Sequence, residues 1–143
     1  MDKEEFLRMY ENGERDFSGI ELRDVDLSNV RLYEINLYKA KLINVNLNYA
    51  HLCNVDLSKA DLSGSSLYWT NLNSAKLTNV NLKNANLSYA NLESANLSNA
   101  ILTNTDLNFA ELLGADLTGT NIEAAINVSS PHLLLIDEYK SNN

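Results

Sequence analysis

The sequence predicts an all-β solenoid with four sides, and three observations carry this prediction. Leucine stands at every fifth position from Leu22 to Leu117, which places twenty leucines in register within a chain of 143 residues. Small or turn-forming residues occupy fixed places around each leucine. Unusual side chains recur at a lag of twenty residues. A fixed period sustained over most of a chain is the sequence signature of a repeat architecture.

The period of five excludes the other regular structures. On an α-helix, apolar residues five apart point about 140° away from each other, and on a long strand they alternate between the two faces. Only a chain that turns every five residues keeps all the leucines inside. Asn or Gly stands two residues after the central residue in ten of the twenty-one repeats from Leu22 to Ile122. These residues tolerate the backbone of a tight corner, so short straight sides joined by turns are predicted.

The number of sides in one coil follows from the lag that aligns unusual residues, because each side must match itself one coil later. Aromatic residues recur at a lag of twenty in one repeat position: Tyr49, Trp69, Tyr89 and Phe109. Hydroxyl residues do the same on another side: Ser58, Thr78, Ser98 and Thr118. A lag of fifteen stacks none of the aromatic residues together. Four pentapeptides per coil therefore predict a quadrilateral cross-section.

The central leucines are expected inside the solenoid, and the residue two before each of them is mostly Ala, Val or Ile. Each fully buried leucine stabilises the fold by about 1.5–3 kcal/mol, so the column can offset the ordering of a narrow chain. Four positions of the row of small residues carry hydroxyl groups instead: Ser65, Thr70, Thr105 and Thr120. These hydroxyls must bond to the backbone, because an unpaired buried polar group destabilises the coil.

Segments 85–89 (Ala-Asn-Leu-Ser-Tyr) and 95–99 (Ala-Asn-Leu-Ser-Asn) resemble the A(D/N)LXX unit of the pentapeptide-repeat family. The resemblance covers about residues 15–125, and the segment from Tyr10 to Leu22 is similar to the start of many cyanobacterial members. The resemblance implies a right-handed quadrilateral β-helix in which the central residue and the residue two before it point inward. Phe17 would then be the first central residue.

The solenoid is expected to have a cap at each end, because both ends expose apolar surface and strand edges. The three predicted segments are a helical cap at 1–14, the solenoid at 15–125, and a C-terminal cap with a short helix and tail at 126–143. Asp2 and Glu5 resemble a capping box, and Gly13 ends the first helix. Four consecutive apolar residues exceed what the C-terminal cap requires and are a candidate homodimer contact: Leu133, Leu134, Leu135 and Ile136.

Composition and charge exclude several classes of protein. Nineteen acidic against eleven basic residues give a net charge of −8, which argues against direct binding to nucleic acid or to an anionic membrane. The single cysteine, Cys53, cannot form an internal disulfide, and no Cys/His cluster is available for a metal. The charged N-terminus and the lack of an apolar run of about 18 residues predict neither a signal peptide nor a membrane span. A cytoplasmic protein without a cofactor is expected.

No catalytic site is expected. His51 and Cys53 flank the inward Leu52 and point outward from the same strand, and a neighbouring histidine can favour a thiolate. Nucleophilic catalysis also needs an oriented base and an oxyanion site in a concavity, which a convex rod does not supply. We interpret both as ordinary outward residues.

The candidate partner-binding residues are the aromatic series Tyr49, Trp69, Tyr89 and Phe109, with Tyr68 widening the strip. Stacking between coils contributes about 0.5–1.5 kcal/mol per pair, so a purely structural ladder is one interpretation. The other is a docking strip for a protein partner, since exposed aromatic residues are enriched at interfaces. The expected function is therefore a non-enzymatic scaffold for an unidentified protein.

Two alternatives stay open. A regular side with Ser58, Thr78, Ser98 and Thr118 raises ice binding, although bulky neighbours such as Lys59 interrupt that side. Some pentapeptide-repeat proteins are similar to duplex DNA in size and charge and bind type II topoisomerases such as gyrase. Here five acidic residues and no basic residue lie between positions 91 and 125: Glu93, Asp106, Glu111, Asp116 and Glu123. Residues 17–125 carry a net charge of only −4, from seven bases and eleven acids, so DNA mimicry is the second choice.

Overall fold

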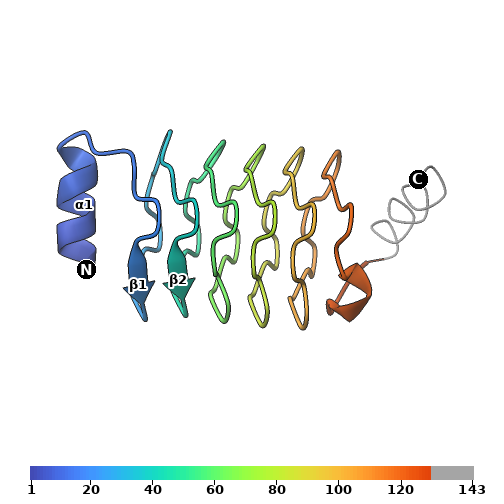
Figure 1. Ribbon diagram of the computed structural model, residues 1–143. Coiled ribbons are helices and arrows are strands. Elements are labelled where there is room, and N and C mark those ends of the chain that lie inside the picture. The colour runs from blue at the N-terminus through green and yellow to red at the C-terminus, as the bar shows by residue number, and fades with distance from the viewer. Residues whose placement is uncertain (130–143) are drawn as a thin grey trace.

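The computed structural model describes residues 1–129, which form a four-sided β-helix with an α-helix across its N-terminal end (Figure 1). The elements are α1 (Lys3–Glu11), β1 (Glu21–Arg23), β2 (Lys41–Ile43) and a short 3-10 helix (Ile122–Ala124). The coils follow one another along a single axis (Figure 1). The candidate homodimer contact Leu133–Ile136 lies outside the described residues.

Each coil is held to the next in a parallel register of twenty residues. β1 and β2 pair with Leu22 beside Leu42, and parallel bridges at the same spacing continue as far as Asp106 beside Ile126. The N–H of Leu27 donates to the carbonyl of Asn46 over 2.7 Å, one example of a bond repeated from coil to coil. The predicted lag of twenty is confirmed, and four pentapeptides complete one coil.

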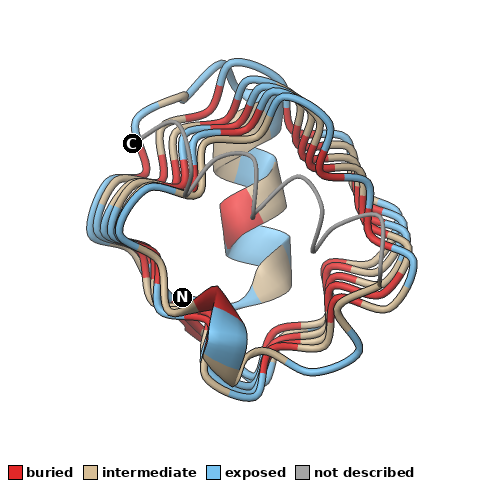
Figure 2. Cartoon of the chain, turned by 90° about the vertical axis from the view of Figure 1, so that its right-hand side faces the viewer, coloured by how far each residue is buried: buried red, intermediate tan, exposed pale blue. Residues whose placement is uncertain are grey.

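The four sides are numbered here in chain order by their central residues. Side 1 runs from Phe17 to Leu117, side 2 from Leu22 to Ile122, side 3 from Leu27 to Leu107 and side 4 from Leu32 to Leu112, each in steps of twenty. Seen along the axis, the coils superpose into one outline, with the buried positions on its inner wall and exposed positions at the corners (Figure 2).

The predicted leucine column forms the core. Every central residue from Phe17 to Leu112 is buried, and the residues two before them are buried from Ile35 to Ala110. Leu117, which the sequence places in the same column, is only half-buried, because within residues 1–129 no strand of side 1 lies beyond it. The column is therefore confirmed, with a less protected last member.

The inward hydroxyls bond to the backbone as predicted. Thr70 Oγ1 donates to the carbonyl of Leu47 over 2.7 Å and Thr105 Oγ1 to that of Leu82 over 2.7 Å. Ser65 does more: its Oγ donates to the carbonyl of Leu42 over 2.6 Å and accepts the N–H of Val45 over 3.0 Å. Ser65 therefore bridges two backbone groups at a corner of the coil before it.

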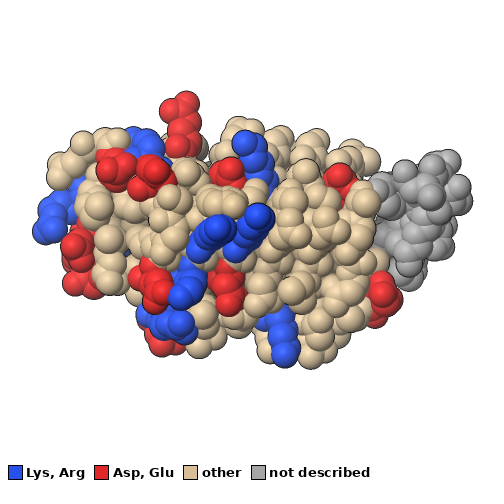
Figure 3. Space-filling view, in the orientation of Figure 1, with Lys and Arg blue, Asp and Glu red and all other residues tan. Residues whose placement is uncertain are grey.

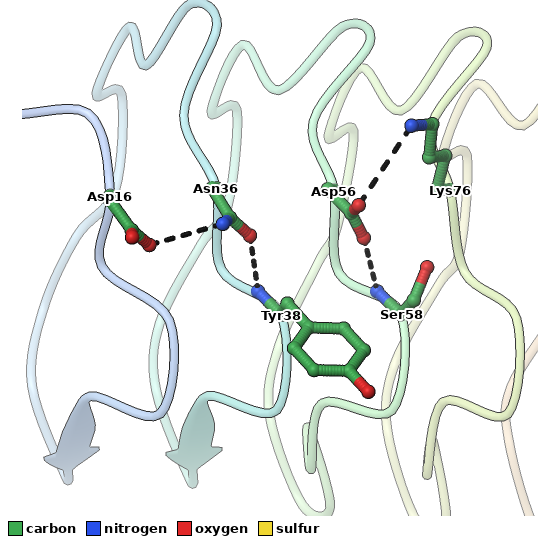
Figure 4. A network of polar contacts seen from close by, with 6 residues as sticks. All are labelled: Asp16, Asn36, Tyr38, Asp56, Ser58 and Lys76. Atoms are coloured by element: carbon green, nitrogen blue, oxygen red, sulfur yellow. Dashed lines mark hydrogen bonds and ion pairs between the residues drawn. The ribbon is translucent and has the colours of Figure 1, made fainter.

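The polar residue immediately before the central residue closes a local turn. On side 1, the side-chain oxygens of Asn36 and Asp56 each accept the backbone N–H two residues later over 2.9 Å (Figure 4). Asp16 accepts the N–H of Ser18 in the same way over 3.1 Å. Such Asx turns need a short side chain with an acceptor oxygen. This requirement explains why Asp or Asn recurs at this position. The amide of Asn36 also donates to Asp16 over 3.0 Å, which links two coils.

Helix α1 covers the first coil. The side chain of Asp2 accepts the N–H of Glu5 over 2.8 Å, so Asp2 is the predicted N-cap. The buried ring of Phe6 packs edge-on against Phe17 with centroids 4.8 Å apart. The hydroxyl of Tyr10 accepts the N–H of Tyr33 over 2.7 Å and donates to its carbonyl over 3.3 Å. The helix thus covers apolar surface and pairs backbone groups of the first coil.

One corner glycine has a packing reason. Gly64 has φ of +69°, and a Cβ added there would lie 2.2 Å from Oδ1 of Asn44 in the preceding coil. The Asn44 amide occupies the space that a Cβ at position 64 would need, so a larger residue there would require the Asn44 side chain to rotate away. Gly119 and Asn99 repeat the arrangement with the same 2.2 Å separation.

We expect Leu72→Asp to unfold the whole solenoid. Leu72 is 1% exposed in the middle of the column, and an unpaired carboxylate there adds several kcal/mol of desolvation to the loss of about 2–5 kcal/mol for a removed leucine. Circular dichroism and a thermal melt check this, with the outward neighbour change Asn73→Asp as a control that should stay folded. A soluble Leu72→Asp protein with an unchanged spectrum would contradict the assigned core.

We expect Asp26→Asn to reduce the loss of unfolding free energy that occurs as the pH falls into the acid range. The backbone N–H of Ser28 donates to Asp26 over 2.9 Å and lowers the pKa of that carboxyl below its usual value. A group with a lowered folded-state pKa stabilises above its unfolded pKa of about 3.9, and the contribution is lost as pH falls through the folded pKa. Asn keeps the acceptor without titrating, whereas Asp26→Ala removes it and should destabilise at every pH. Urea melts between about pH 2 and pH 6 distinguish the two variants.

Candidate functional site

The candidate site is the corner between sides 3 and 4, where five aromatic rings gather. We name it the aromatic corner, and its members are Tyr49, Tyr68, Trp69, Tyr89 and Phe109. Four of them occupy the corner position itself, and Tyr68 is the outward residue of side 3 next to Trp69. The lag of twenty brings them together because residues in one repeat position lie beside each other in successive coils.

The backbone at the aromatic corner is left-handed. Tyr49, Trp69, Tyr89 and Phe109 have φ of 60°, 55°, 59° and 55°, which is rare for bulky residues. Hydrogen bonds between coils hold this conformation: the N–H of Trp69 donates to the carbonyl of Ser88 over 3.1 Å. The N–H of Tyr89 donates to the carbonyl of Asn108 over 2.8 Å. The solenoid therefore imposes the corner turn whatever side chain stands there.

Three rings form a parallel stack. The centroids of Trp69 and Tyr89 are 5.1 Å apart with planes 7° from parallel, and those of Tyr89 and Phe109 are 5.1 Å apart at 21°. Tyr49 joins through Tyr68, which meets Tyr49 edge-on at 5.7 Å and Tyr89 edge-on at 5.6 Å. Tyr68 is thus a connecting member of the group, whereas the sequence suggested only that it widens the strip.

The aromatic corner is open to solvent along its length. Tyr49, Trp69 and Phe109 are 50%, 52% and 63% exposed, and Tyr68 and Tyr89 are half-buried. The rings therefore contact each other without being covered by the rest of the described chain.

Side 4 adjoins the aromatic corner and carries outward columns that the sequence analysis did not compare along the rod. Just past the corner, one column of outward residues reads Arg31, His51, Asn71, Asn91 and Glu111. The next outward column begins with Tyr33 and ends with Leu113, which are 48% and 64% exposed. Reading each column at a lag of twenty would have shown that one end of side 4 is basic and the other acidic.

Charges of both signs are mixed over the N-terminal coils. Figure 3 shows basic and acidic side chains close together on that part of one face and a largely uncharged surface toward the other end. Lys41 and Glu21 form an ion pair, which lowers the pKa of Glu21 through the hydrogen bond and the positive charge of Lys41. Lys39 and Lys59 both lie over the ring of Tyr38, at 5.3 and 5.7 Å from its centroid.

Comparisons with known proteins identify the architecture. The family model described as pentapeptide repeats matches the chain in eight copies, over residues 35–73, 65–104 and 85–123. The chain belongs to the pentapeptide-repeat family. The fold is therefore the right-handed quadrilateral β-helix that the resemblance implied. No curated protein matches the sequence.

Solved structures of other pentapeptide-repeat proteins are similar to this one. The protein alr5209 from the cyanobacterium Nostoc is 36% identical, with a TM-score of 0.67, and the match covers 82% of this chain and 96% of that one. A pentapeptide repeat protein of the Arabidopsis thaliana thylakoid lumen is 22% identical over 85% of this chain and 77% of its own, with a TM-score of 0.55. QnrB1, a plasmid-mediated fluoroquinolone resistance protein, is 22% identical over 77% of this chain and 58% of its own, with a TM-score of 0.45.

This pentapeptide-repeat protein places His51 and Cys53 half-buried on side 4. Within residues 1–129, no group of three or more His, Cys, Asp or Glu side chains could hold a metal ion, and no pocket interrupts the described surface. Across that same range, no helix has the length and apolar character needed to cross a bilayer.

The Ser/Thr series of the pentapeptide-repeat solenoid lies on side 1, where its hydroxyls bond locally. Ser98 Oγ donates to Asn96 over 2.6 Å, and Thr118 Oγ1 donates to Asp116. Two of the four hydroxyls are thus bonded to the Asx residue before them, and Lys76 stands in the place of an Asx residue before Thr78. The side therefore does not present the regular free array that ice binding needs.

The five acidic residues of the C-terminal coils are divided among all sides of the pentapeptide-repeat solenoid. Glu93 and Glu111 lie on side 4, Asp106 on side 3, Asp116 on side 1 and Glu123 on side 2. Asp106 also accepts hydrogen bonds from the N–H of Asn108 and the amide of Asn127, both over 3.0 Å. No side therefore carries a continuous acidic row.

Proposed function

We propose that this pentapeptide-repeat protein is a non-enzymatic scaffold that binds another protein through the aromatic corner. The observation that carries the proposal is the exposed, ordered group of rings at Tyr49, Trp69 and Phe109. Soluble proteins seldom expose contiguous apolar surface without using it, and aromatic side chains supply much of the energy of protein interfaces.

The ring geometry favours a protein partner over a sugar or a nucleobase. Sugars and bases stack on exposed ring faces, but in the stack of Trp69, Tyr89 and Phe109 the faces are turned toward one another. The inner faces of the stack are therefore covered, and its ring edges form much of the exposed surface. Apolar and aromatic side chains pack against such edges, because edge-to-face contacts are favourable.

The backbone conformation supports the same proposal. Four bulky left-handed residues destabilise by about 1–2 kcal/mol each, about 4–8 kcal/mol in total. The four ring pairs stabilise the corner by about 0.5–1.5 kcal/mol each, about 2–6 kcal/mol in total. Ten of the other corners carry Asn or Gly, which adopt this backbone with less strain, so a purely structural corner had less strained alternatives.

Gyrase binding by DNA mimicry is not favoured by any feature of the described surface. The acidic residues of the C-terminal coils are spread over four sides, and their fields decay over about 8 Å at physiological salt. The net charge of −8 also disfavours direct contact with nucleic acid or an anionic membrane. The single cysteine fits a reducing compartment, so we place the scaffold in the cytoplasm.

We expect Trp69→Ser/Tyr89→Ser to abolish partner binding while the fold is kept, since serine already occupies left-handed corners at Ser74 and Ser94. The matched control is Lys59→Ser/Asn79→Ser, two corner positions at the same lag between sides 1 and 2. Proteins from the source cell that are captured by the wild type and the control, but lost by the aromatic variant, are candidate partners. A purified candidate is then titrated while the emission of Trp69, the only tryptophan, is followed.

The emission of Trp69 should be red-shifted and quenchable by acrylamide in the free monomer, and should shift to the blue when the partner binds. The proposal fails if Trp69 is already shielded in a proven monomer, or if the aromatic variant captures the same proteins as the wild type. Inhibition of gyrase supercoiling by both the wild type and the aromatic variant would support the DNA-mimic alternative instead.

A further inference from the structure

We propose that side 4 binds a second copy of this chain, with the two rods antiparallel and a two-fold axis along the strand of residues 69–74. The proposal rests on the proposed function, because the aromatic corner forms one edge of side 4 and a second copy becomes its protein partner. It is carried by the chemistry of the outward columns of side 4.

A two-fold axis along a strand has a simple consequence for these columns. It reverses the long axis of the rod and leaves each column facing itself, so a residue one coil before the axis meets the residue one coil after it in the second copy. Such an isologous interface is complementary only if, in each column, the residues before the axis can pair favourably with the residues after it.

The first outward column of side 4 has opposite charges at its two ends. Arg31 lies two coils before Asn71, and Glu111 lies two coils after it. In the antiparallel pair, Arg31 of each copy therefore faces Glu111 of the other, and both side chains are exposed in the single chain. Asn71 meets itself on the axis, where a carboxamide can both donate and accept.

The second outward column of side 4 has an exposed apolar side chain at each end. Tyr33 and Leu113, the exposed large apolar side chains of this column, lie two coils before and two coils after Asn73. The same operation places Tyr33 of each copy against Leu113 of the other. Along the aromatic corner it places Trp69 against itself, Tyr49 against Tyr89 and Phe109 against Asn29, so three of the four corner rings meet a ring.

Sides 1 and 3 do not match in this way. The antiparallel operation places Asp16 against Asp116 on side 1 and Asp26 against Asp106 on side 3, and facing like charges disfavour association. On side 2 an axis between two coils pairs Arg23 with Glu123, but that side carries no aromatic residue. Side 4 is therefore the side on which opposite charges, exposed apolar ends and the aromatic corner occur together.

The available area sets the strength of the contact. Five coils at about 4.8 Å give a side about 24 Å long, and one pentapeptide side with the corner rings is about 15 Å wide. The pair would bury roughly 700 Å² in total, which is less than the 1,200–2,000 Å² or so of a stable complex. A weak, concentration-dependent and salt-sensitive dimer is therefore expected.

Charge reversal and exchange test the pairing. Arg31→Glu and Glu111→Arg each place like charges opposite each other twice per dimer, so each should weaken dimerisation about tenfold or more by sedimentation equilibrium. The double exchange Arg31→Glu/Glu111→Arg should restore it, and Lys83→Glu on side 2 is the control that should leave it unchanged. A wild type that stays monomeric up to about 1 mM, or a double exchange that fails to rescue, would overturn the proposal.

Cross-linking tests the position of the axis. Asn73 meets itself across the proposed axis and, unlike Asn71, is not the acceptor that closes the local turn. In a Cys53→Ser background, Asn73→Cys should form a covalent dimer with a short bis-maleimide, and Lys83→Cys should not. Cys53 lies one coil from the axis, so its counterpart is displaced along the rod by about 9.6 Å, and oxidation of the wild type should give no disulfide dimer. Equal cross-linking at positions 73 and 83 would contradict the assignment.

The two proposals can fail separately. If the wild type remains monomeric while Trp69→Ser/Tyr89→Ser still loses a captured protein, the self-association is wrong and the scaffold function stands. If the charge exchange behaves as expected but the aromatic variant keeps both its dimer and every captured protein, the aromatic corner is structural and the proposed function fails.

Discussion

A left-handed backbone at each corner is the constraint on which the rest of the structure depends. The turn at every fifth residue brings each leucine back to the interior, and the coil closes after four such turns, which sets the register of twenty residues between coils. Hydrogen bonds between coils then repeat along the rod. The Asp and Asn residues that precede central positions accept hydrogen bonds from the backbone N–H two residues later. Without the corners, the leucines would not share one side of the chain, and neither the core nor the stacked columns would exist.

The same constraint makes the outer surface a set of straight columns, in which chemistry is organised by coil number. Side chains twenty residues apart become neighbours. One residue per coil therefore determines a ring stack such as Trp69 and Tyr89, or a change of charge along the rod such as that from Arg31 to Glu111. The interior contributes little to specificity, because it repeats. Recognition on such a rod depends on the residues of a column that differ from the repeat consensus. Most of the outward aromatic residues of this kind lie on sides 3 and 4.

The sequence alone was sufficient for the fold because each local requirement repeats many times. The buried leucines, the bonded hydroxyls of Ser65 and Thr70 and the cap by Asp2 all followed from period, burial and capping rules. The site was less predictable. The lag of twenty aligned the aromatic residues, but it could not show that Tyr68 is inserted between Tyr49 and Tyr89, since that depends on side-chain rotamers. Nor did the order of residues along the chain relate Arg31 to Glu111, which are eighty residues apart and share one column only through the stacking of coils.

A repetitive interior has a consequence for how this chain finds its native arrangement. If a growing solenoid slipped by one or more pentapeptides, leucine would still stack on leucine, so the core penalises such errors weakly. The pair of Gly64 and Asn44 adds a modest penalty, because the Asn44 amide occupies the space of the missing Cβ and would have to rotate if a larger residue were stacked on it. Ser65 beside it is bonded to two backbone groups of one particular corner. These adjacent departures from the consensus thus act as an index mark in the middle of the rod, from which coils on either side can be counted correctly.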